Sequence, residues 1–457
     1  MIKKRKKFIE DFNNNLNKYK NNLPINIKNK SIVYETDSCF LIERFSCKNK
    51  NYSQSNTLNY PTKIVNEVIN CKKIKMVLNS EQILIFDKWF NAYTEMYNES
   101  LNYIRNNCNF FKNNIIRSQL KNTKLNEFTN FQKIRNKLKS IKNNIQQKSI
   151  YKGKVIRIHT LDYAIKQLTS NIKSSISNLK NGNIKRFRLK FWKNNRPSKT
   201  IELEKEHFMK GKLSPTIFGE IKYLYNNKDY KLSEINHNVK VNYNLIKKEY
   251  TLLIPITNKT KEIENKSRNI IVLDPGLRTF MTGLSECEQL NIGININKIL
   301  RDKIKRLNKI RINKNIPNKI KKKNEILINR KIYNTVDEIH WKTINFLIRN
   351  FRNILLGDMS AKSIVSRNKS VLSNNAKVAC LRTRYYQFQQ RLKYKCQLSR
   401  TNYRLVNECY TSKICSNCGY YKEDLKGEKR YCCNKCNISL DRDINGCRNI
   451  MIKSLMK

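Results

Sequence analysis

The sequence predicts a multidomain chain of mixed α/β and α+β class, with an α/β domain in its C-terminal half. Short, continuously apolar runs such as 270–273 and 354–356 are typical of strands buried on both faces of a sheet. Alternating stretches between residues 184 and 260 predict a half-buried β domain, and apolar residues at helical spacing fill 81–183. With 457 residues, the chain is long enough for two or three domains.

The charge of the chain points to a polyanionic partner. Lys and Arg number 93 against 35 Asp and Glu, a formal charge of +58, spread along the whole chain. Such a charge opposes compaction unless a polyanion shares the structure, and nucleic acid is the obvious one. A bias toward AT-rich codons accounts for the many Asn residues and for Lys over Arg, but not for the shortage of acids. Neither a secretion signal nor a membrane span is expected, because no apolar run has the required length or position.

Residues 1–68 are rich in Asn and Lys and predict a flexible basic extension, although 31–34 and 39–42 have the composition of short strands. Lys3 to Lys7 resembles a nuclear import signal. In so basic a chain, a run of this kind is about as often a chance product of composition as it is an import signal, so both interpretations stay open.

Residues 69–80 and 184–260 predict a wedge-like, β-barrel-like domain, into which 81–183 is inserted as a helical recognition element. Residues 73–78 alternate like a strand, and Asn79 to Gln82 has helix-cap chemistry. Packing in the core, rather than base stacking, is the favoured role of the aromatic-rich stripe that follows. The stripe comprises Leu84, Phe86, Trp89, Phe90, Tyr93, Met96, Tyr97 and Leu101. A second apolar face comprises Leu161, Ala164, Leu168, Ile172, Ile176 and Leu179. Further strands are expected at 187–191, 201–204, 239–243 and 250–256.

Residues 268–457 predict the α/β domain, in which acids stand at the ends of buried strands. The run 270–273 ends in Asp274, and a buried carboxylate is costly unless a cation or hydrogen-bond donors receive it. Two strands of a meander, two basic helices meeting near Pro317 and one more helix are expected before the strand that reaches Asp358. After a helix at 376–398, a last strand leads to Glu408. Asp443 opens the C-terminal helix.

Four cysteines within 410–437 predict a zinc site. Cys415, Cys418, Cys433 and Cys436 form two Cys-x-x-Cys pairs, and four thiolates suit a closed structural Zn²⁺ site in a reducing compartment. Cys432 leaves a register ambiguity, in which Cys433 gives the required spacing. Gly419 and Asn437 follow the two pairs and tolerate the positive φ of tight thiolate turns.

The acids suggest a second, harder metal site. Strands and a helix that deliver Asp274, Glu408 and Asp443 have the layout of an RNase H-like (RuvC) nuclease, in which Mg²⁺ or Mn²⁺ assists hydrolysis of phosphodiesters. Three roles stay open. Asp358 is an alternative to Glu408, Asp441 either caps the following helix or supports Asp443, and Arg278 either contacts a phosphate or anchors its turn.

Three motifs resemble the transposon-encoded TnpB nucleases, relatives of type V CRISPR effectors with a RuvC-like domain. They are IVLDPGLRTF (271–280), YTSKICSNCG (410–419) and DRDINGCRNI (441–450), and the resemblance covers roughly 70–457. TnpB proteins carry a catalytic Glu where this chain has Gly357. The eukaryotic and viral Fanzor branch resembles the sequence more closely, because a substitute Glu appears there just before Tyr-Thr-Ser, the position of Glu408.

The resemblance implies an RNA-guided DNA endonuclease that binds a guide RNA and target double-stranded DNA as a monomer in a ribonucleoprotein. It implies Asp274, Glu408 and Asp443 as magnesium ligands, and the nucleus of a eukaryotic host, with a viral gene as a possible source. Two alternatives stay open: a decayed nucleic-acid-binding protein of transposon origin and, less favoured, a strand-transferring transposase.

Overall fold

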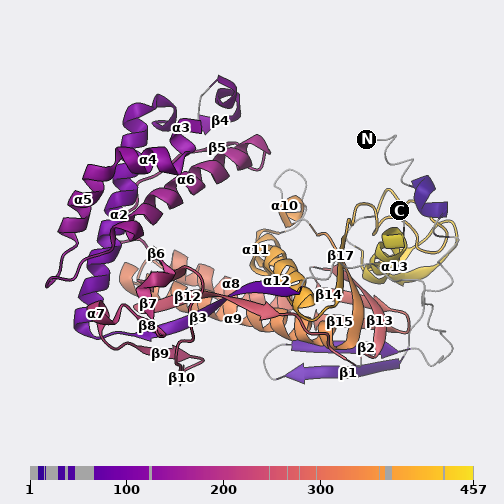
Figure 1. Cartoon of the computed structure of the whole chain (residues 1–457). Coiled ribbons are helices and arrows are strands. Elements are labelled where there is room, and N and C mark those ends of the chain that lie inside the picture. Colours follow the sequence, from indigo (N-terminus) through magenta and orange to yellow (C-terminus); the bar gives the residue numbers. More distant parts are fainter. Residues whose placement is uncertain are drawn as a thin grey trace. The chain divides into compact units, whose positions relative to one another are not determined.

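The chain forms two compact units in the computed structural model, one of Met1–Val68 with Asn258–Lys457 and one of Ile69–Thr257 (Figure 1). Each unit has its own hydrophobic core: one cluster in Ile69–Thr257 and two clusters in the other unit. The structure describes residues 9–14, 16, 29–36, 40–46, 66–122, 126–245, 247–264, 266–276, 278–294, 296–359, 361–365, 373–425 and 428–455.

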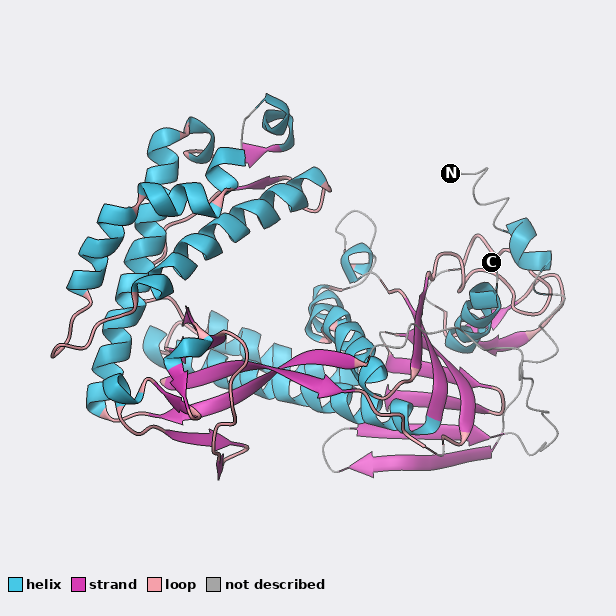
Figure 2. Cartoon of the chain, viewed as in Figure 1, coloured by secondary structure: helices cyan, strands magenta, loops and turns pink. Residues whose placement is uncertain are grey.

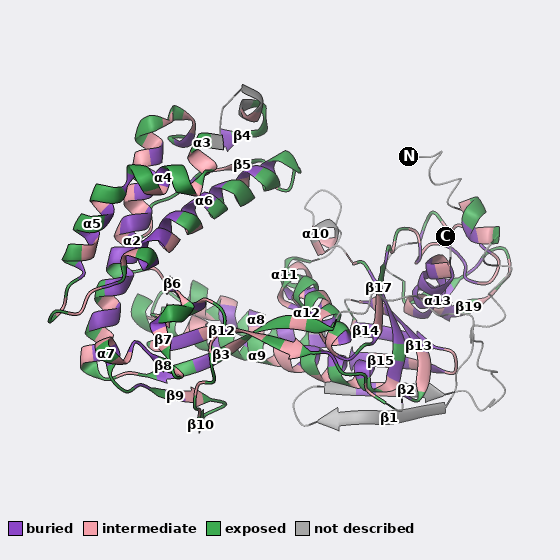
Figure 3. Cartoon of the chain, viewed as in Figure 1, coloured by how far each residue is buried: buried purple, intermediate pink, exposed green. Residues whose placement is uncertain are grey.

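The helical part of unit 69–257 is organised around two long helices, α2 (Ser80–Asn107) and α6 (Ile158–Lys180), which pack on each other. The short helices α3 (Asn126–Thr129), α4 (Phe131–Lys137) and α5 (Lys139–Lys148) lie along them. The predicted cap is confirmed: Asn79 and Gln82 form a reciprocal capping box. Both predicted apolar faces are buried, except that Leu84 is 47% exposed. Figure 3 shows these helices with buried and exposed faces.

The β part of this unit is a six-stranded sheet in the order β10-β9-β3-β12-β11-β6. Its strands are β3 (Glu67–Val77), β6 (Ser198–Leu203), β9 (Lys222–Tyr225), β10 (Lys228–Asp229), β11 (Val239–Asn244) and β12 (Glu249–Lys259). Smaller elements are β7 (Phe208–Met209), β8 (Lys212–Leu213) and α7 (Pro215–Phe218). The barrel-like closure of this sheet stays a prediction.

The strand predicted over 187–191 is too long. The structure has only β5 (Arg186–Phe187), paired with β4 (Ile115–Ile116). Beyond it, the guanidinium of Arg105 donates to the carbonyl of Leu189 and lies over the ring of Phe191. A side chain thus takes the place of a partner strand.

The other unit contains a seven-stranded sheet in the order β1-β2-β15-β14-β13-β16-β17 (Figure 2). Its core is the predicted antiparallel meander of β13 (Arg268–Pro275), β14 (Thr279–Ser285) and β15 (Glu288–Ile294). The strands β16 (Phe351–Gly357) and β17 (Asn402–Val406) then run parallel to β13. A small hairpin of β18 (Arg430–Cys432) and β19 (Ser439–Asp441) lies after the first cysteine pair.

Within the described part of residues 1–68, the flexible extension is wrong, whereas the short strands offered at 31–34 and 39–42 are present. β1 (Asn29–Thr36) and β2 (Phe40–Ser46) form a hairpin, and β2 pairs with β15 at the edge of the meander. In the short helix at 9–14, Phe12 is fully buried in a core that also contains Val272 and Ile450. An edge strand gains from a partner, which the hairpin supplies. The run Lys3 to Lys7 lies outside the described residues.

Helices cover both faces of this sheet, which explains the continuous apolar run of β13. Ile271 and Leu273 face one core, and Ile270 and Val272 face the other. The first core includes side chains of α8 (Ile296–Ile312), α9 (Asn318–Asn350), α11 (Asn374–Arg382) and α12 (Tyr385–Leu398). The second includes side chains of α13 (Arg442–Leu455). Asp274 lies two residues after Val272, so its side chain is on the face of β13 that is covered by α13.

Two helix predictions need correction. The helix expected around 339–348 is the continuation of α9, and the helix expected over 376–398 is broken at Thr383 and Arg384. Arg384 has a φ of 50° and forms an ion pair of 2.7 Å with Asp337, while His340 Nε2 lies 2.9 Å from the carbonyl oxygen of Thr383. Side chains of α9 therefore stabilise a break that neither Gly nor Pro marks.

Candidate metal centres

The sheet topology brings three of the predicted positions to one edge. β13, β16 and β17 are adjacent and parallel, so their carboxyl ends lie together, where ligands commonly bind in such sheets. Asp274 lies at the end of β13, Gly357 ends β16, and Glu408 follows β17 by two residues. Asp443 lies in the first turn of α13, which packs on β13.

Asp274 lies directly against α13. A Cβ atom added to Gly446 would come within 2.3 Å of Asp274 Oδ2, so the helix approaches this closely only because residue 446 is a glycine. Burial raises the pKa of Asp274 well above its usual range, and the charges of Glu408 and Asp443 raise it further, against the opposing charge of Arg442. The charges of Glu408 and Asp443 therefore both reach the carboxyl of Asp274. Among the described residues, only the four cysteines discussed below form a group of ligand atoms close enough to hold one ion.

The carboxylate of Glu408 occupies the space that a side chain at position 357 would fill. A Cβ atom on Gly357 would lie 2.0 Å from Glu408 Oε1. This oxygen is buried and has no hydrogen-bond partner among the described residues. Burial and the charge of Asp358 raise the pKa of Glu408 to about 8, although Lys453 opposes the shift. A buried acceptor without a donor, among other acids, is the environment that a cation would stabilise.

The chemistry of these donors suits a hard divalent ion. Mg²⁺ and Mn²⁺ prefer oxygen ligands, and a cation beside Asp274 would offset the charges of Glu408 and Asp443 that raise its pKa. Asp274, Glu408 and Asp443 would hold such ions, and this assignment stays a proposal.

The remaining predicted residues lie at or near this site. Asp441 Oδ1 accepts a hydrogen bond of 2.8 Å from the backbone N–H of Asp443, which makes Asp441 the cap of α13. Arg278 is exposed. The pKa of Asp443 is raised by burial and by the charge of Asp441, and the charge of Arg278 partly opposes this increase. Asp358 is also exposed, and its backbone N–H donates 2.8 Å to the carbonyl of Val406. Whether Asp358 holds a metal and whether Arg278 contacts a phosphate stay predictions.

These shifts predict that the protein without Mg²⁺ or Mn²⁺ loses stability as the pH rises. The pKa of Glu408 is about 8 in the folded chain against an ordinary value of 4.5. Between these values the folded state keeps a proton that the unfolded state has released, so stability falls with increasing pH. We expect the melting temperature of the zinc-loaded protein without added Mg²⁺ or Mn²⁺ to decrease from pH 5.5 to 8.5. The decrease should be smaller in Glu408→Gln and in wild type with Mg²⁺, and an equal decrease in all three would contradict the site.

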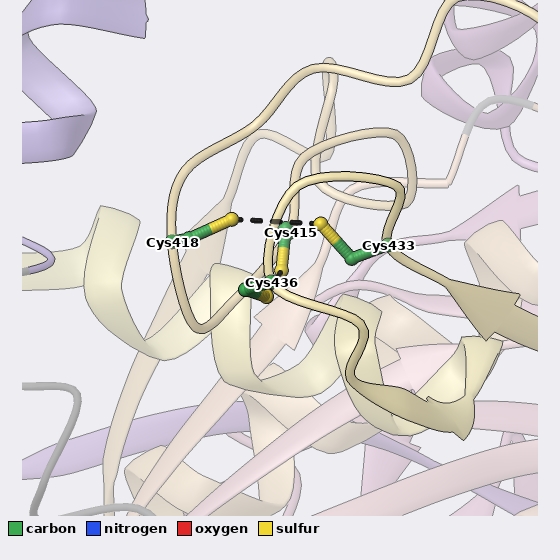
Figure 4. A group of neighbouring side chains, drawn as sticks. All are labelled: Cys415, Cys418, Cys433 and Cys436. Carbon is green, nitrogen blue, oxygen red and sulfur yellow. Dashed lines mark hydrogen bonds between the residues drawn. The ribbon is translucent and has the colours of Figure 1, made fainter.

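The four predicted cysteines form a second cluster, whose sulfur atoms all lie within 4.8 Å of one another (Figure 4). The Sγ atoms of Cys415 and Cys436 are 3.6 Å apart and those of Cys418 and Cys433 are 3.5 Å apart. A disulfide would require about 2.05 Å, whereas four sulfurs bound tetrahedrally to zinc at about 2.3 Å lie roughly 3.8 Å apart. The cluster therefore fits Zn²⁺.

The turns around this cluster have the predicted geometry. Gly419 and Asn437 have φ values of 72° and 54°, and each donates its N–H to the carbonyl of the first cysteine of its pair, at 2.9 and 3.0 Å. Cys432 is exposed and its Sγ lies 3.5 Å from Ser439 Oγ, outside the cluster. The register with Cys433 is therefore confirmed.

The sequence did not reveal the polar face with which α13 holds the segment between Glu408 and Cys415. The amide of Asn445 bonds to Ser416 N and Ile414 O, at 2.9 and 2.8 Å, and the fully buried Arg448 donates 2.9 Å to Ser416 Oγ. Asn449 donates to the carbonyl of Thr411 at 2.6 Å. The available signal was spacing: the three residues stand at i, i+3 and i+4 of an otherwise apolar helix face.

Tyr385 was also missed. Its hydroxyl is buried and donates 2.6 Å to the carbonyl of Gly357, beside the carboxylates. This bond fixes the end of β16 to the start of α12.

Comparison with known proteins agrees with this geometry. The model of the Cas12f1-like TNB domain matches residues 385–450, a span that holds Glu408, the four cysteines and Asp443. The TnpB-like protein L770 of Acanthamoeba polyphaga mimivirus is 29% identical over 392 residues, 84% of this chain and 73% of the relative. The chain is thus similar to TnpB-like proteins, and these matches support a TnpB-type protein. A second mimivirus relative, the TnpB-like protein R854, is equally similar, at 29% over 392 residues. The putative transposase A625R of Paramecium bursaria Chlorella virus 1 is 27% identical over 45% of this chain and 48% of the relative.

Two solved structures show a weaker likeness to this chain. A Cas12f1-sgRNA-target DNA complex gives a TM-score of 0.39 at 14% identity, over 84% of this chain and 99% of that one. The mini-RNA-guided endonuclease CRISPR-Cas_phi3 gives 0.42 at 10% identity, over 88% and 94%. Within the described part of the chain, no helix has the length and apolar character needed to cross a membrane.

Proposed function

We propose that the chain is an RNA-guided DNA endonuclease of the Fanzor branch, with an RNase H-like (RuvC) nuclease domain at 268–457. The observation that carries the proposal is the carboxylate of Glu408, placed where a side chain of Gly357 would be and beside Asp274, with one buried oxygen unpaired. The family's missing acid is thus replaced in space by one from another segment. The name of the mimivirus relative and the match to the Cas12f1-like domain support the same assignment.

In this proposal the three carboxylates act as one unit. Asp274, Glu408 and Asp443 would hold Mg²⁺ or Mn²⁺, which when bound activates water and stabilises the leaving oxygen of a phosphodiester. Arg278, exposed beside Asp443, would contact the scissile phosphate. The Zn²⁺ of the cysteine cluster would be structural, since its four thiolates leave no open position.

The partners follow from the same proposal. A guide RNA would read the target by base pairing, while the protein binds the backbone of the heteroduplex and a short flanking motif in double-stranded DNA. The charge of +58 suits two such polyanions. We propose a monomer in a ribonucleoprotein that acts in the nucleus of a eukaryotic host.

Glu408→Gln compared with Asp358→Asn tests the assignment. Glu408→Gln should lower Mg²⁺-dependent cleavage of a guide-matched duplex by about a hundredfold or more, because a neutral amide cannot replace a metal-binding carboxylate. Asp358→Asn should stay within about threefold of wild type, because its side chain is exposed. The reverse order would make Asp358 the second acid. If the wild type with its co-purified RNA cuts nothing, the chain is instead a nucleic-acid binder that has lost activity.

A further inference from the structure

The helix α13 carries a polar stripe of Asn445, Asn449 and Lys453, spaced four residues apart and therefore on one face. The amides of Asn445 and Asn449 donate to Ile414 O at 2.8 and 2.7 Å, and Asn449 also donates to Thr411 O. Lys453, one turn further along α13, lies on the same helix face and contacts the N-terminal end of the segment that begins near Glu408.

Lys453 contacts the residues on both sides of Glu408. Its ammonium group donates to the carbonyl oxygen of Cys409 at 3.1 Å and to Asn407 Oδ1 at 3.3 Å. Asn407 Oδ1 also accepts the backbone N–H of Cys409 at 2.8 Å, which closes a tight turn around Glu408. The carbonyl of Glu408 accepts from the backbone N–H of Thr411 at 3.1 Å and from its hydroxyl at 2.9 Å.

The position of Glu408 depends on this turn, whereas the position of a residue within a strand is fixed by the neighbouring strands. Glu408 lies beyond the last ladder pair of β17, so no strand partner fixes its backbone. Its side chain nevertheless lies over Gly357, where a Cβ atom would come within 2.0 Å of Glu408 Oε1. The charge of Lys453 also reaches Glu408 and favours the ionised form that a metal ion requires.

We propose that Lys453 is a positioning residue that holds the Asn407–Cys409 turn so that Glu408 reaches the divalent metal site over Gly357. The proposal rests on the proposed function only in taking Glu408 as a metal ligand.

Mn²⁺ binding to the full chain, measured by electron paramagnetic resonance, tests the proposal without requiring cleavage. Lys453→Met keeps most of the side-chain volume but removes the donors and the charge. It should weaken Mn²⁺ binding by about tenfold, the effect typical of residues that orient metal ligands. Lys453→Arg should restore affinity to within about threefold of wild type. The matched control is Lys393→Met, which removes an exposed lysine of α12 and should leave Mn²⁺ affinity unchanged.

Three outcomes would overturn the proposal. Lys453→Met could bind Mn²⁺ as tightly as wild type, or Lys453→Arg could bind it as weakly as Lys453→Met. In the third outcome, Asp274→Asn would bind Mn²⁺ as well as wild type does, so that no Mn²⁺ binding depends on the carboxylates. The last outcome also removes the proposed function. A wild type that binds Mn²⁺ but cuts no DNA would remove only the endonuclease activity. Cleavage supplies a second readout, since excess Mg²⁺ should restore activity to Lys453→Met but not to Glu408→Gln.

Discussion

Asp274→Asn should abolish DNA cleavage, lowering the rate by about a thousandfold or more, while co-purification of RNA stays unchanged. The expected size follows from losing a ligand of the metal that stabilises the transition state, since each 1.36 kcal/mol corresponds to about tenfold in rate. The fold should persist because Asn has the same shape, and because the wild-type carboxyl is repelled by Glu408 and Asp443. Single-turnover cleavage of a guide-matched duplex, with sequencing of the bound RNA, measures both effects.

Asp302→Asn provides the control for this experiment. Asp302 is an exposed residue of α8 in the same unit, so the same change of charge and shape occurs away from the carboxylates. We expect its cleavage rate to equal that of wild type. Cleavage by Asp274→Asn at a rate near that of the control would contradict the catalytic assignment of all three acids.

Cys433→Ser should release the zinc and destabilise the segment that carries Glu408. Structural zinc sites contribute on the order of 10 kcal/mol to folding of small domains, so losing even part of this should lower the melting temperature by about 10 °C. Because Asn445 and Asn449 bind the backbone of Ser416 and Thr411, and Arg448 binds the hydroxyl of Ser416, hydrogen exchange should increase across 408–418. Zinc content by mass spectrometry, thermal unfolding and hydrogen exchange measure these changes.

The neighbouring Cys432→Ser is the matched variant. Cys432 is exposed and its sulfur lies outside the cluster, so this protein should retain about one zinc per chain and wild-type stability. Equal zinc loss in both variants would show that the ligand register differs from the one described.

Features encoded by local spacing were predictable from the sequence. The cysteine pairs fixed the zinc cluster, the capping box at Asn79 and Gln82 marked the start of α2, and the run ending in Asp274 marked a strand buried on both faces. In each case the residues that determine the feature lie within a few positions of one another, so their periodicity is visible in the chain.

Features that depend on distant contacts were not predictable in this way. The sequence offered short strands at 31–34 and 39–42, but it did not show their pairing with the meander, because the partner strand β15 lies more than two hundred residues away. The polar face of α13 was overlooked because Asn is abundant throughout the chain and is normally exposed. The place of Glu408 came from the family resemblance, since no local pattern connects it with Gly357.

The shared space of residues 357 and 408 constrains how this protein family can have evolved. In the proposed site, a chain with carboxylates at both positions would place two acids in one volume, and a chain with neither would lack one of the proposed metal ligands. Under that proposal, moving the acid from the strand to the later turn would pass through one of these two states, whichever substitution comes first. Gly357→Glu, which returns the acid to the strand, should preserve cleavage only when Glu408 is also removed, as in Glu408→Ala. The two positions should therefore change together.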